Sequence, residues 1–332
     1  MSMYRKTEFL AALRKRGLDE SAIQTHLQAI AGLDSSLAAR GLSLERPKLA
    51  AVEAWLSERL REGESIYDFL IPAARYFTAA RQETVAIRLM AYLLPIGVLP
   101  AMADRLTTLE GEAVRSHVMS GVTIPAEGSP PEAYPDATAR FVEALEAEIG
   151  PEKARRVLAW NVHEIPTAAF ALDRERFLDL GSIDAWLLDH HRRQVEILRR
   201  HAKDGTLWFE QRITQAVVDF VEARPEILGG VREGDIIYTT KIPYDPDGYL
   251  QATDGLERRR LACHCPLALA SITERDAGVP PLWCACSAGY TKFMFDVVFG
   301  EETETVVLES VLSGSERCRF AIKIPPSVSL GA

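Results

Sequence analysis

The sequence predicts an α+β protein in which a helical bundle precedes a second helical region that ends in an antiparallel sheet. Two observations support this. Apolar residues recur at helical spacing through residues 1–120. After Gly234, short runs of β-branched and aromatic residues alternate with turn residues. The chain of 332 residues is long enough for two domains of ordinary size.

The composition is that of a globular protein, with 47% hydrophobic and 26% charged residues. A net charge of -9 argues against a general nucleic-acid binder. The N-terminus has no signal-like apolar run, and no segment reaches the roughly 20 uninterrupted apolar residues of a membrane helix. We therefore expect a cytoplasmic protein with a small-molecule partner, and with neither a nucleic-acid nor a membrane partner. In the cytoplasm, free or metal-bound thiols are favoured over disulfides.

Residues 1–120 are expected to form a helical bundle. A short first helix stops at Gly17, Asp19 is a good N-cap for a longer helix, and Gly41 ends that helix. The remaining predicted helices of this part cover residues 52–60, 66–77 and 84–94.

The stretch FLAALRKRGLDESAIQTHLQAI resembles the helical core-binding domain of tyrosine recombinases, over residues 4–95. The resemblance implies a small helical domain. A recombinase also needs a catalytic half with an Arg, a His-x-x-Arg motif and a nucleophilic Tyr. His190 and Arg193 match the His-x-x-Arg spacing, but they lie inside a predicted helix and lack the expected sequence context, including a suitable Tyr after them. We therefore expect a helical module without recombinase activity.

Residues 121–136 contain four prolines and two glycines, which predicts a linker before a second domain at 137–332. The predicted helices of that domain cover residues 137–148, 152–160, 167–178, 182–202 and 287–299. The predicted strands cover 235–241 and 261–265, followed by a hairpin of 303–312 with 317–324.

The five cysteines all lie in the last seventy residues, and four of them form two Cys-x-Cys pairs. Cys263 and Cys265 would share one face of a strand. Cys284 and Cys286 lie at a helix start, where the dipole lowers a thiol pKa. Four such thiolates can close a tetrahedral zinc site, although the usual knuckle is Cys-x-x-Cys. A reactive thiol without metal and inert buried cysteines remain alternatives. Cys318 is expected on the buried face of the sheet.

Two strings near the C-terminus, WCACSAGYTKFMFDVVFG and VVLESVLSGSERCRFAIKIP, are similar to 4-vinyl-reductase-type small-molecule-binding domains. They also resemble L-2-amino-thiazoline-4-carboxylic acid hydrolase-like proteins, over residues 150–325. The matching positions are Cys263, Cys286, Gly289 and 318–320. The resemblance implies a small-molecule domain, and for the second family a hydrolase of a small carboxylated, thiazoline-like substrate. The doubled Cys-x-Cys departs from both patterns.

The candidate catalytic residues are Cys263 or Cys286 as nucleophile and His163 with Glu164 as an acid–base pair. The histidine and its neighbour precede Pro166, so they are expected in a loop or at a helix end. A purely local turn is the alternative for this pair.

The candidate substrate-binding residues combine aromatic walls with a few polar groups, as small-molecule sites do. They are Trp208, Phe209, Glu210, Lys241 and Tyr244. We expect a cavity beside the cysteines with walls from this set, and Lys241 can pair with a substrate carboxylate.

Two functions therefore remain open. One is a hydrolase acting on C–N bonds, and the other is a non-catalytic binding or sensory module whose cysteines form a structural metal site. The sequence leaves the oligomeric state open.

Overall fold

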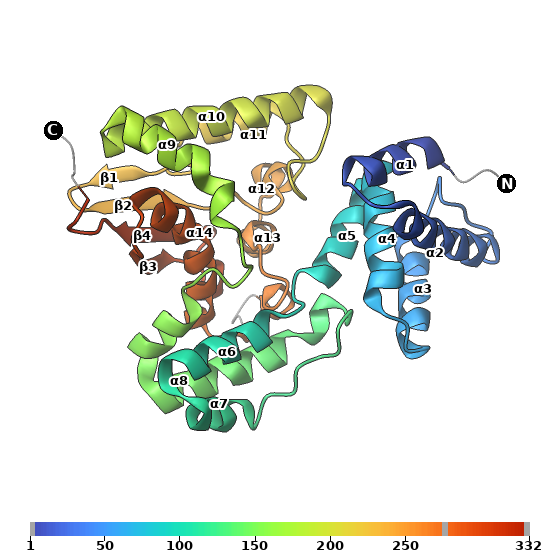
Figure 1. Ribbon diagram of the computed structural model, residues 1–332, viewed down its shortest axis with the longest axis horizontal. Helices are drawn as coiled ribbons and strands as arrows, with labels where there is room; N and C mark the ends of the chain where they lie inside the picture. The colour runs from blue at the N-terminus through green and yellow to red at the C-terminus, as the bar shows by residue number, and fades with distance from the viewer. Residues whose placement is uncertain (1–3, 274–277, 329–332) are drawn as a thin grey trace. The chain divides into compact units, whose positions relative to one another are not determined.

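The computed structural model describes residues 4–273 and 278–328, and its fold class is α+β as predicted (Figure 1). The chain divides into two compact units. The first is Met1–Ile96 with Ala126–Pro130, and the second is Gly97–Pro125 with Pro131–Ala332.

The first unit is helical. Its helices are α1 (Lys6–Lys15), α2 (Glu20–Ala38), α3 (Leu49–Arg61), α4 (Ile66–Ala79) and α5 (Glu83–Leu93). The predicted N-cap of α2 is confirmed, because the Asp19 carboxylate accepts a hydrogen bond from the Ala22 N–H at 2.8 Å. The apolar stripe of α2 faces a core that includes Phe9, Ile30 and Phe69.

The division between the units differs from the predicted boundary at residue 120. Helices α6 (Val98–Glu110) and α7 (Glu112–Met119) pack against α8 (Pro135–Leu158) and so belong to the second unit. The proline-rich segment is not a simple linker, because residues 126–130 return to the first unit. Gly128 has a φ of 78°, and a Cβ there would lie 2.8 Å from Ile66 Cγ2. Only glycine fits this approach without strain.

The second unit continues with helices and a small sheet. Its further α-helices are α9 (Ala171–Leu180), α10 (Ile183–Asp204), α11 (Gln215–Glu222), α12 (Pro246–Gln251), α13 (Gly255–Ala262) and α14 (Cys284–Phe299). Short 3₁₀ turns are η1 (Pro131–Ala133), η2 (Thr167–Phe170), η3 (Leu269–Ser271), η4 (Pro281–Trp283) and η5 (Val311–Ser313). Helix α8 is interrupted at Gly150, with a φ of 78°, which matches the two helices predicted there.

The sheet is antiparallel, with the strand order β1-β2-β4-β3. Its strands are β1 (Val231–Glu233), β2 (Ile236–Thr240), β3 (Glu304–Glu309) and β4 (Arg319–Lys323). The predicted hairpin is confirmed, since Val306 of β3 pairs with Ala321 of β4. The same Ala321 pairs with Tyr238 of β2 on its other side.

One face of this sheet is covered by α10 and α14. Ile237 of β2 and Ile322 of β4 pack there against Trp186 of α10 and against Phe295 and Val298 of α14. Cys318 lies just before β4 in register with Phe320 and Ile322, and all three are buried as predicted. Tyr238 and Arg319 point to the opposite face, where the guanidinium lies 4.6 Å from the ring centroid.

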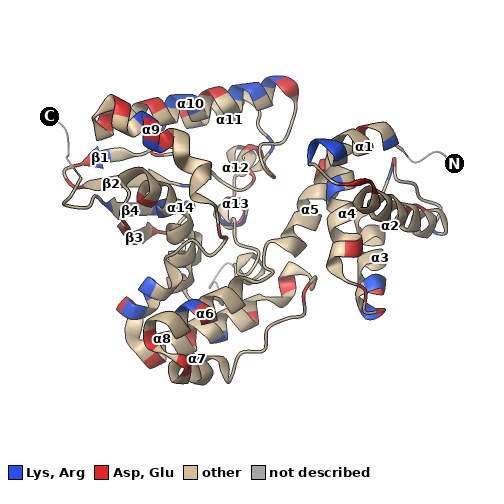
Figure 2. Cartoon of the chain, viewed as in Figure 1, with Lys and Arg blue, Asp and Glu red and all other residues tan. Residues whose placement is uncertain are grey.

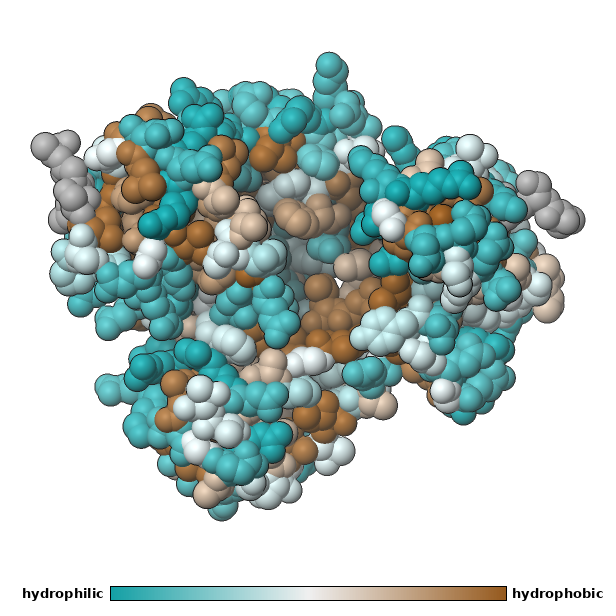
Figure 3. Space-filling model, viewed as in Figure 1, coloured by the Kyte–Doolittle hydropathy of each residue, from teal (hydrophilic) through white to brown (hydrophobic). Residues whose placement is uncertain are grey.

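Charged residues of both signs are mixed along α9 and α10 (Figure 2), and hydrophilic residues are spread over the visible outside of each unit (Figure 3). Among the described residues, Glu83–Glu110 is long and apolar enough to cross a membrane by length and composition. The sequence prediction did not anticipate this. A core helix passes the same test, and this stretch is divided at Gly97 into α5 and α6, whose Leu89 and Met102 are fully buried.

Helix α14 approaches the end of α8 very closely at Gly289. A Cβ at this position would lie 2.2 Å from the Trp160 backbone nitrogen and 2.5 Å from the Ala159 carbonyl carbon. No side chain fits in that space without moving one of the two backbones. Gly289 therefore holds the turn that follows α8 against α14.

We expect Gly289→Ala to lower the free energy of unfolding by about 1–3 kcal/mol, because the added methyl group overpacks a backbone contact. The matched control is Gly32→Ala in α2, where nothing lies within 4 Å. That change should stabilise by about 0.5–1 kcal/mol through helix propensity. Urea unfolding monitored by circular dichroism measures both, and equal stabilisation by the two changes would contradict the close approach.

Candidate functional site

The five cysteines converge in the core of the second unit. Cys263 follows the last residue of α13 and Cys265 begins the next turn, while Cys284 and Cys286 lie in the first turn of α14. Together with Cys318 they belong to, or pack against, one apolar cluster. Cys265, Cys284 and Cys318 lie close enough to Cys263 to raise its pKa electrostatically. The two Cys-x-Cys pairs are therefore neighbours in space.

The predicted strand at 261–265 is wrong. Helix α13 runs to Ala262, with Asp254 as its N-cap, since the Asp254 carboxylate accepts from the Glu257 N–H at 2.8 Å. Arg260 anchors its last turn by donating to the Ile272 carbonyl. Cys263 and Cys265 therefore lie in a turn and not on one face of a strand.

Burial dominates the chemistry of these thiols. It raises the pKa of Cys284 and of Cys286 well above the ordinary value, although both lie at a helix start. The helix dipole does not offset this loss of solvation. Burial also raises the pKa of Cys265, opposed by a hydrogen bond at 3.1 Å from Trp283 Nε1 to Cys265 Sγ. The thiols are therefore protonated, in contrast to the thiolates expected from the helix position alone.

The candidate zinc ligands are the four cysteines of the two Cys-x-Cys pairs. Within 4–273 and 278–328, no three His, Cys, Asp or Glu side chains are placed so that they could hold a metal ion. His264, which lies between the two thiols of the first pair, donates from Nε2 to the Ile242 carbonyl at 2.6 Å. Burial and the nearby Lys241 lower the pKa of His264 to about 3, so it is neutral at physiological pH.

Lys241 brings a polar group to the cysteines. It follows the last residue of β2, and its backbone N–H donates to the Cys318 carbonyl. Its side chain runs along the face covered by α14, where Nζ donates to Ser287 Oγ at 3.1 Å. Burial lowers the pKa of this amine, and the neighbouring cysteines, Cys318 first, partly oppose the shift. An amine that loses its charge easily thus lies in hydrogen-bond contact with a serine.

Aromatic and polar groups surround the hydrogen-bonded pair of Lys241 and Ser287. Lys241 Nζ lies 5.0 Å from the ring centroid of Tyr290, which is one turn after Ser287 on α14. The Tyr290 ring, 42% exposed, meets the His163 ring edge-on at 5.8 Å. Burial and the charge of Glu210 raise the pKa of Tyr290. The pair therefore has an outer rim of His163, Tyr290 and Glu210.

Tyr244 forms a second aromatic neighbour of the centre. Its ring meets His264 edge-on at 5.4 Å, and its buried hydroxyl has no hydrogen-bond partner in the part of the chain that the structure describes. Burial, with the charge of Glu210 as a second cause, raises its pKa. This hydroxyl is free to bond a ligand or water.

Several predicted site residues are not brought to the centre. Phe209 is 73% exposed in a turn closed by Trp208 and Gln211, so it forms no cavity wall. Trp208 packs with the separate apolar cluster beneath α10 and α11. Glu164 is exposed in a turn where Asn161 makes two hydrogen bonds to the Ile165 backbone. The His163 ring, by contrast, contacts Tyr290.

One cavity lies next to two of the residues at the end of β2. This cavity of about 850 Å³ is lined by Lys241 and Pro243, but not by Trp208, Phe209 or Tyr244. The sequence analysis missed Ser287 and Tyr290. Their signal was the three-residue spacing in CACSAGY at a helix start, which places both side chains on one side of the helix.

Comparison with known proteins matches residues 247–329 to the model of a family of unknown function (DUF6144). The matched segment contains all five cysteines and α14, and begins after Lys241. Neither the curated proteins nor the solved structures contain a match to this chain.

We expect the native protein to react slowly with a disulfide reagent such as Ellman's, because buried protonated thiols are poor nucleophiles. Cys265 is more exposed than the other four and should react first, so Cys265→Ser should remove the fastest phase. Unfolded protein should titrate all five cysteines.

Slow thiol labelling could result either from burial or from metal binding, and metal analysis of the same sample distinguishes the two causes. From the observed geometry we expect no stoichiometric zinc, and labelling rates that a chelator does not change. About one zinc per chain, with faster labelling after chelation, would show that the cysteines rearrange into a zinc site.

Proposed function

We propose that the second unit is a hydrolase of C–N bonds in a small carboxylated substrate, with Ser287 as the nucleophile and Lys241 as its general base. The hydrogen bond of 3.1 Å between Lys241 Nζ and Ser287 Oγ carries this proposal. Serine is a weak nucleophile unless an adjacent base activates it, and lysine is that base in one known variant of the hydrolytic triad. The resemblance to the thiazoline-carboxylate hydrolases supports the substrate class.

The reaction follows from these two groups. The neutral amine of Lys241 takes the hydroxyl proton as Ser287 Oγ bonds to the electrophilic carbon. The resulting ammonium then returns the proton to the leaving nitrogen as the C–N bond breaks. Water next attacks the same carbon of the serine adduct and the amine takes its proton; the bond from that carbon to Ser287 Oγ then breaks, and the ammonium returns the proton to Oγ. Ser287 lies in the first turn of α14, where the helix dipole favours negative charge that develops on the atoms attached to the attacked carbon.

This assignment moves the nucleophile away from Cys263 and Cys286. Both thiols are buried and their pKa values are raised, so little thiolate is present near neutral pH. We assign the cysteines a packing role around the lysine. No step of the reaction uses a metal, and we infer that the protein acts in the cytoplasm.

A non-catalytic binding module is the second candidate, and the partnerless Tyr244 hydroxyl favours it. In that case a ligand would bond Tyr244 and Lys241 without turnover. The recombinase-like helical unit would then be a docking element.

A fluorophosphonate probe, which forms a covalent bond with activated serines, tests the nucleophile directly. We expect peptide mapping to find the adduct on Ser287, and both Ser287→Ala and Lys241→Met to abolish labelling. Ser116→Ala is the matched control, because Ser116 is an exposed serine on α7. Equal labelling of wild type and Ser287→Ala would contradict the proposal.

Turnover of L-2-amino-thiazoline-4-carboxylic acid tests the reaction class. We expect Ser287→Ala and Lys241→Met to lower kcat by about a thousandfold or more, as loss of a nucleophile or its base does. If the labelling succeeds but this substrate is not turned over, the substrate class is wrong. If neither labelling nor turnover occurs, the binding module is favoured.

The pH dependence follows from the lowered pKa of Lys241. The base must be neutral, so activity should rise with pH through that pKa and fall as the amine is protonated. Because burial lowers the pKa below the usual 10.5, the rise should come at lower pH than for an ordinary lysine. A labelling rate that is flat in pH would exclude Lys241 as the base.

A further inference from the structure

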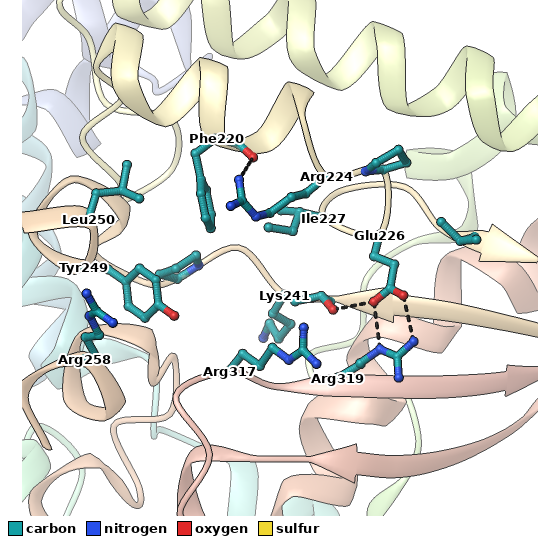
Figure 4. Close-up of a pocket in the computed structure, with 14 residues that line it drawn as sticks. Phe220, Arg224, Glu226, Ile227, Lys241, Tyr249, Leu250, Arg258, Arg317 and Arg319 are labelled. Carbon is teal, nitrogen blue, oxygen red and sulfur yellow. Dashed lines mark hydrogen bonds and ion pairs between the residues drawn. The ribbon is translucent and has the colours of Figure 1, made fainter. Parts of the chain in front are cut away.

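A large cavity lies on the face of the sheet opposite to the cysteines (Figure 4). Its volume of about 850 Å³ is in the range of small-molecule sites. It is formed between the end of α11, the ends of β2 and β4, and helices α12 and α13. Arg317 and Arg319 point into it, while Cys318 between them is buried on the inner face.

Basic side chains dominate the lining of this cavity. Arg224, Arg258, Arg317 and Arg319 all line it, against a single lining carboxylate, Glu226, among the residues described. The whole chain has a net charge of -9, so this concentration of arginine is a local exception. Paired guanidinium groups are the usual means by which proteins bind carboxylate and phosphate.

Arg319 of β4 and Arg317, two residues before it, are held in place by carboxylates but keep N–H donors free. Arg319 donates from Nε at 2.8 Å and from Nη2 at 2.7 Å to Glu226. Arg317 donates from Nε at 3.0 Å and from Nη2 at 2.6 Å to Glu309. A guanidinium has five N–H donors, so the Nη1 group of each remains available. The two ion pairs orient these donors in advance.

Arg224 differs from the other three because no carboxylate in the described part of the chain pairs with it. Its Nη1 donates to the Phe220 carbonyl at 3.1 Å, and its guanidinium stacks on the Phe220 ring at 4.3 Å. Figure 4 shows the Arg224 guanidinium beside Phe220, with Arg317 and Arg319 on the opposite side of the cavity. Arg258 donates to Glu316 at 3.2 Å on the far side.

The cavity also has an apolar side that can hold a ring. The Phe220 and Tyr249 rings lie 6.3 Å apart with their planes at 52°. Ile227, Leu250 and Pro243 complete this part of the lining. Aromatic and aliphatic walls beside convergent arginines are the combination that an organic anion with a ring requires.

We propose that this cavity binds a ring-bearing organic oxyanion, a phosphate or carboxylate whose charged group bonds Arg224, Arg317 and Arg319. The ring lies between Phe220 and Tyr249. Lys241 also lines this cavity, but its Nζ bonds Ser287 of α14, so the anion site formed by the arginines does not depend on the proposed hydrolase.

Isothermal titration of the full chain with phenyl phosphate and with benzoate tests the site and distinguishes the two oxyanions. Benzyl alcohol supplies the ring without charge, and inorganic phosphate supplies the charge without the ring. We expect at least one aromatic anion to bind, more tightly than either partial probe. Binding should weaken as salt rises.

Arg224→Ala should raise the dissociation constant at least about tenfold, which corresponds to about 1.4 kcal/mol. The matched control is Arg200→Ala, an exposed arginine on α10 outside the cavity lining, which should leave binding unchanged. Phe220→Leu should weaken the aromatic anions but not inorganic phosphate.

Two results would overturn the proposal. One is binding that Arg224→Ala does not weaken, and the other is no binding of either aromatic anion up to about 10 mM, where even a weak specific site would be occupied. Fluorophosphonate labelling of Ser287 in the same variants reports on the hydrolase separately, so the two proposals can fail independently.

Discussion

The packing of α14 between the sheet and the end of α8 is the constraint on which the second unit depends. On one side, Phe295 and Val298 fill the space above β2 and β4. On the other, Gly289 lets the Trp160 backbone approach to a distance that no other residue permits. The end of the helix is fixed by Asp296, whose Oδ1 accepts from both the backbone N–H and the hydroxyl of Thr303 at 2.7 Å. Ser287, Tyr290 and two of the cysteines owe their positions to this one helix.

The balance of burial and charge sets the chemistry of the centre. Two arrangements of protons are possible in the centre. In one, a charged lysine and charged thiolates stabilise each other; in the other, the amine and the thiols are all neutral. Loss of solvation favours the neutral arrangement, because burial is the largest cause of the shifts at Lys241 and at Cys286. Burial thus lowers the pKa of the Lys241 amine and raises that of the Cys286 thiol, which is the setting that our proposal of Ser287 as nucleophile requires.

Most of the local structure could be predicted from the sequence, but little of the candidate site could. The cap at Asp19, the break at Gly150 and the β3–β4 hairpin were predicted because each depends on neighbours in the chain. Residues 261–265 were assigned to a strand because five residues cannot distinguish a strand from the end of a helix. Ser287 was missed because its significance comes from Lys241, which is 46 residues away. The buried position of Cys318 was predicted, but the cavity beside Arg317 and Arg319 also depends on Phe220 and Tyr249, which lie on helices distant in the sequence.

The path of the chain has a consequence for cutting the protein into parts. The polypeptide leaves the first unit after Ile96, completes α6 and α7, returns for residues 126–130, and leaves again. A fragment that ends at residue 96 would lack the segment at Gly128 that covers Ile66. A fragment that begins at residue 97 would carry that segment with nothing to pack on. The two units are therefore interleaved in sequence, and no single peptide bond separates one intact unit from the other.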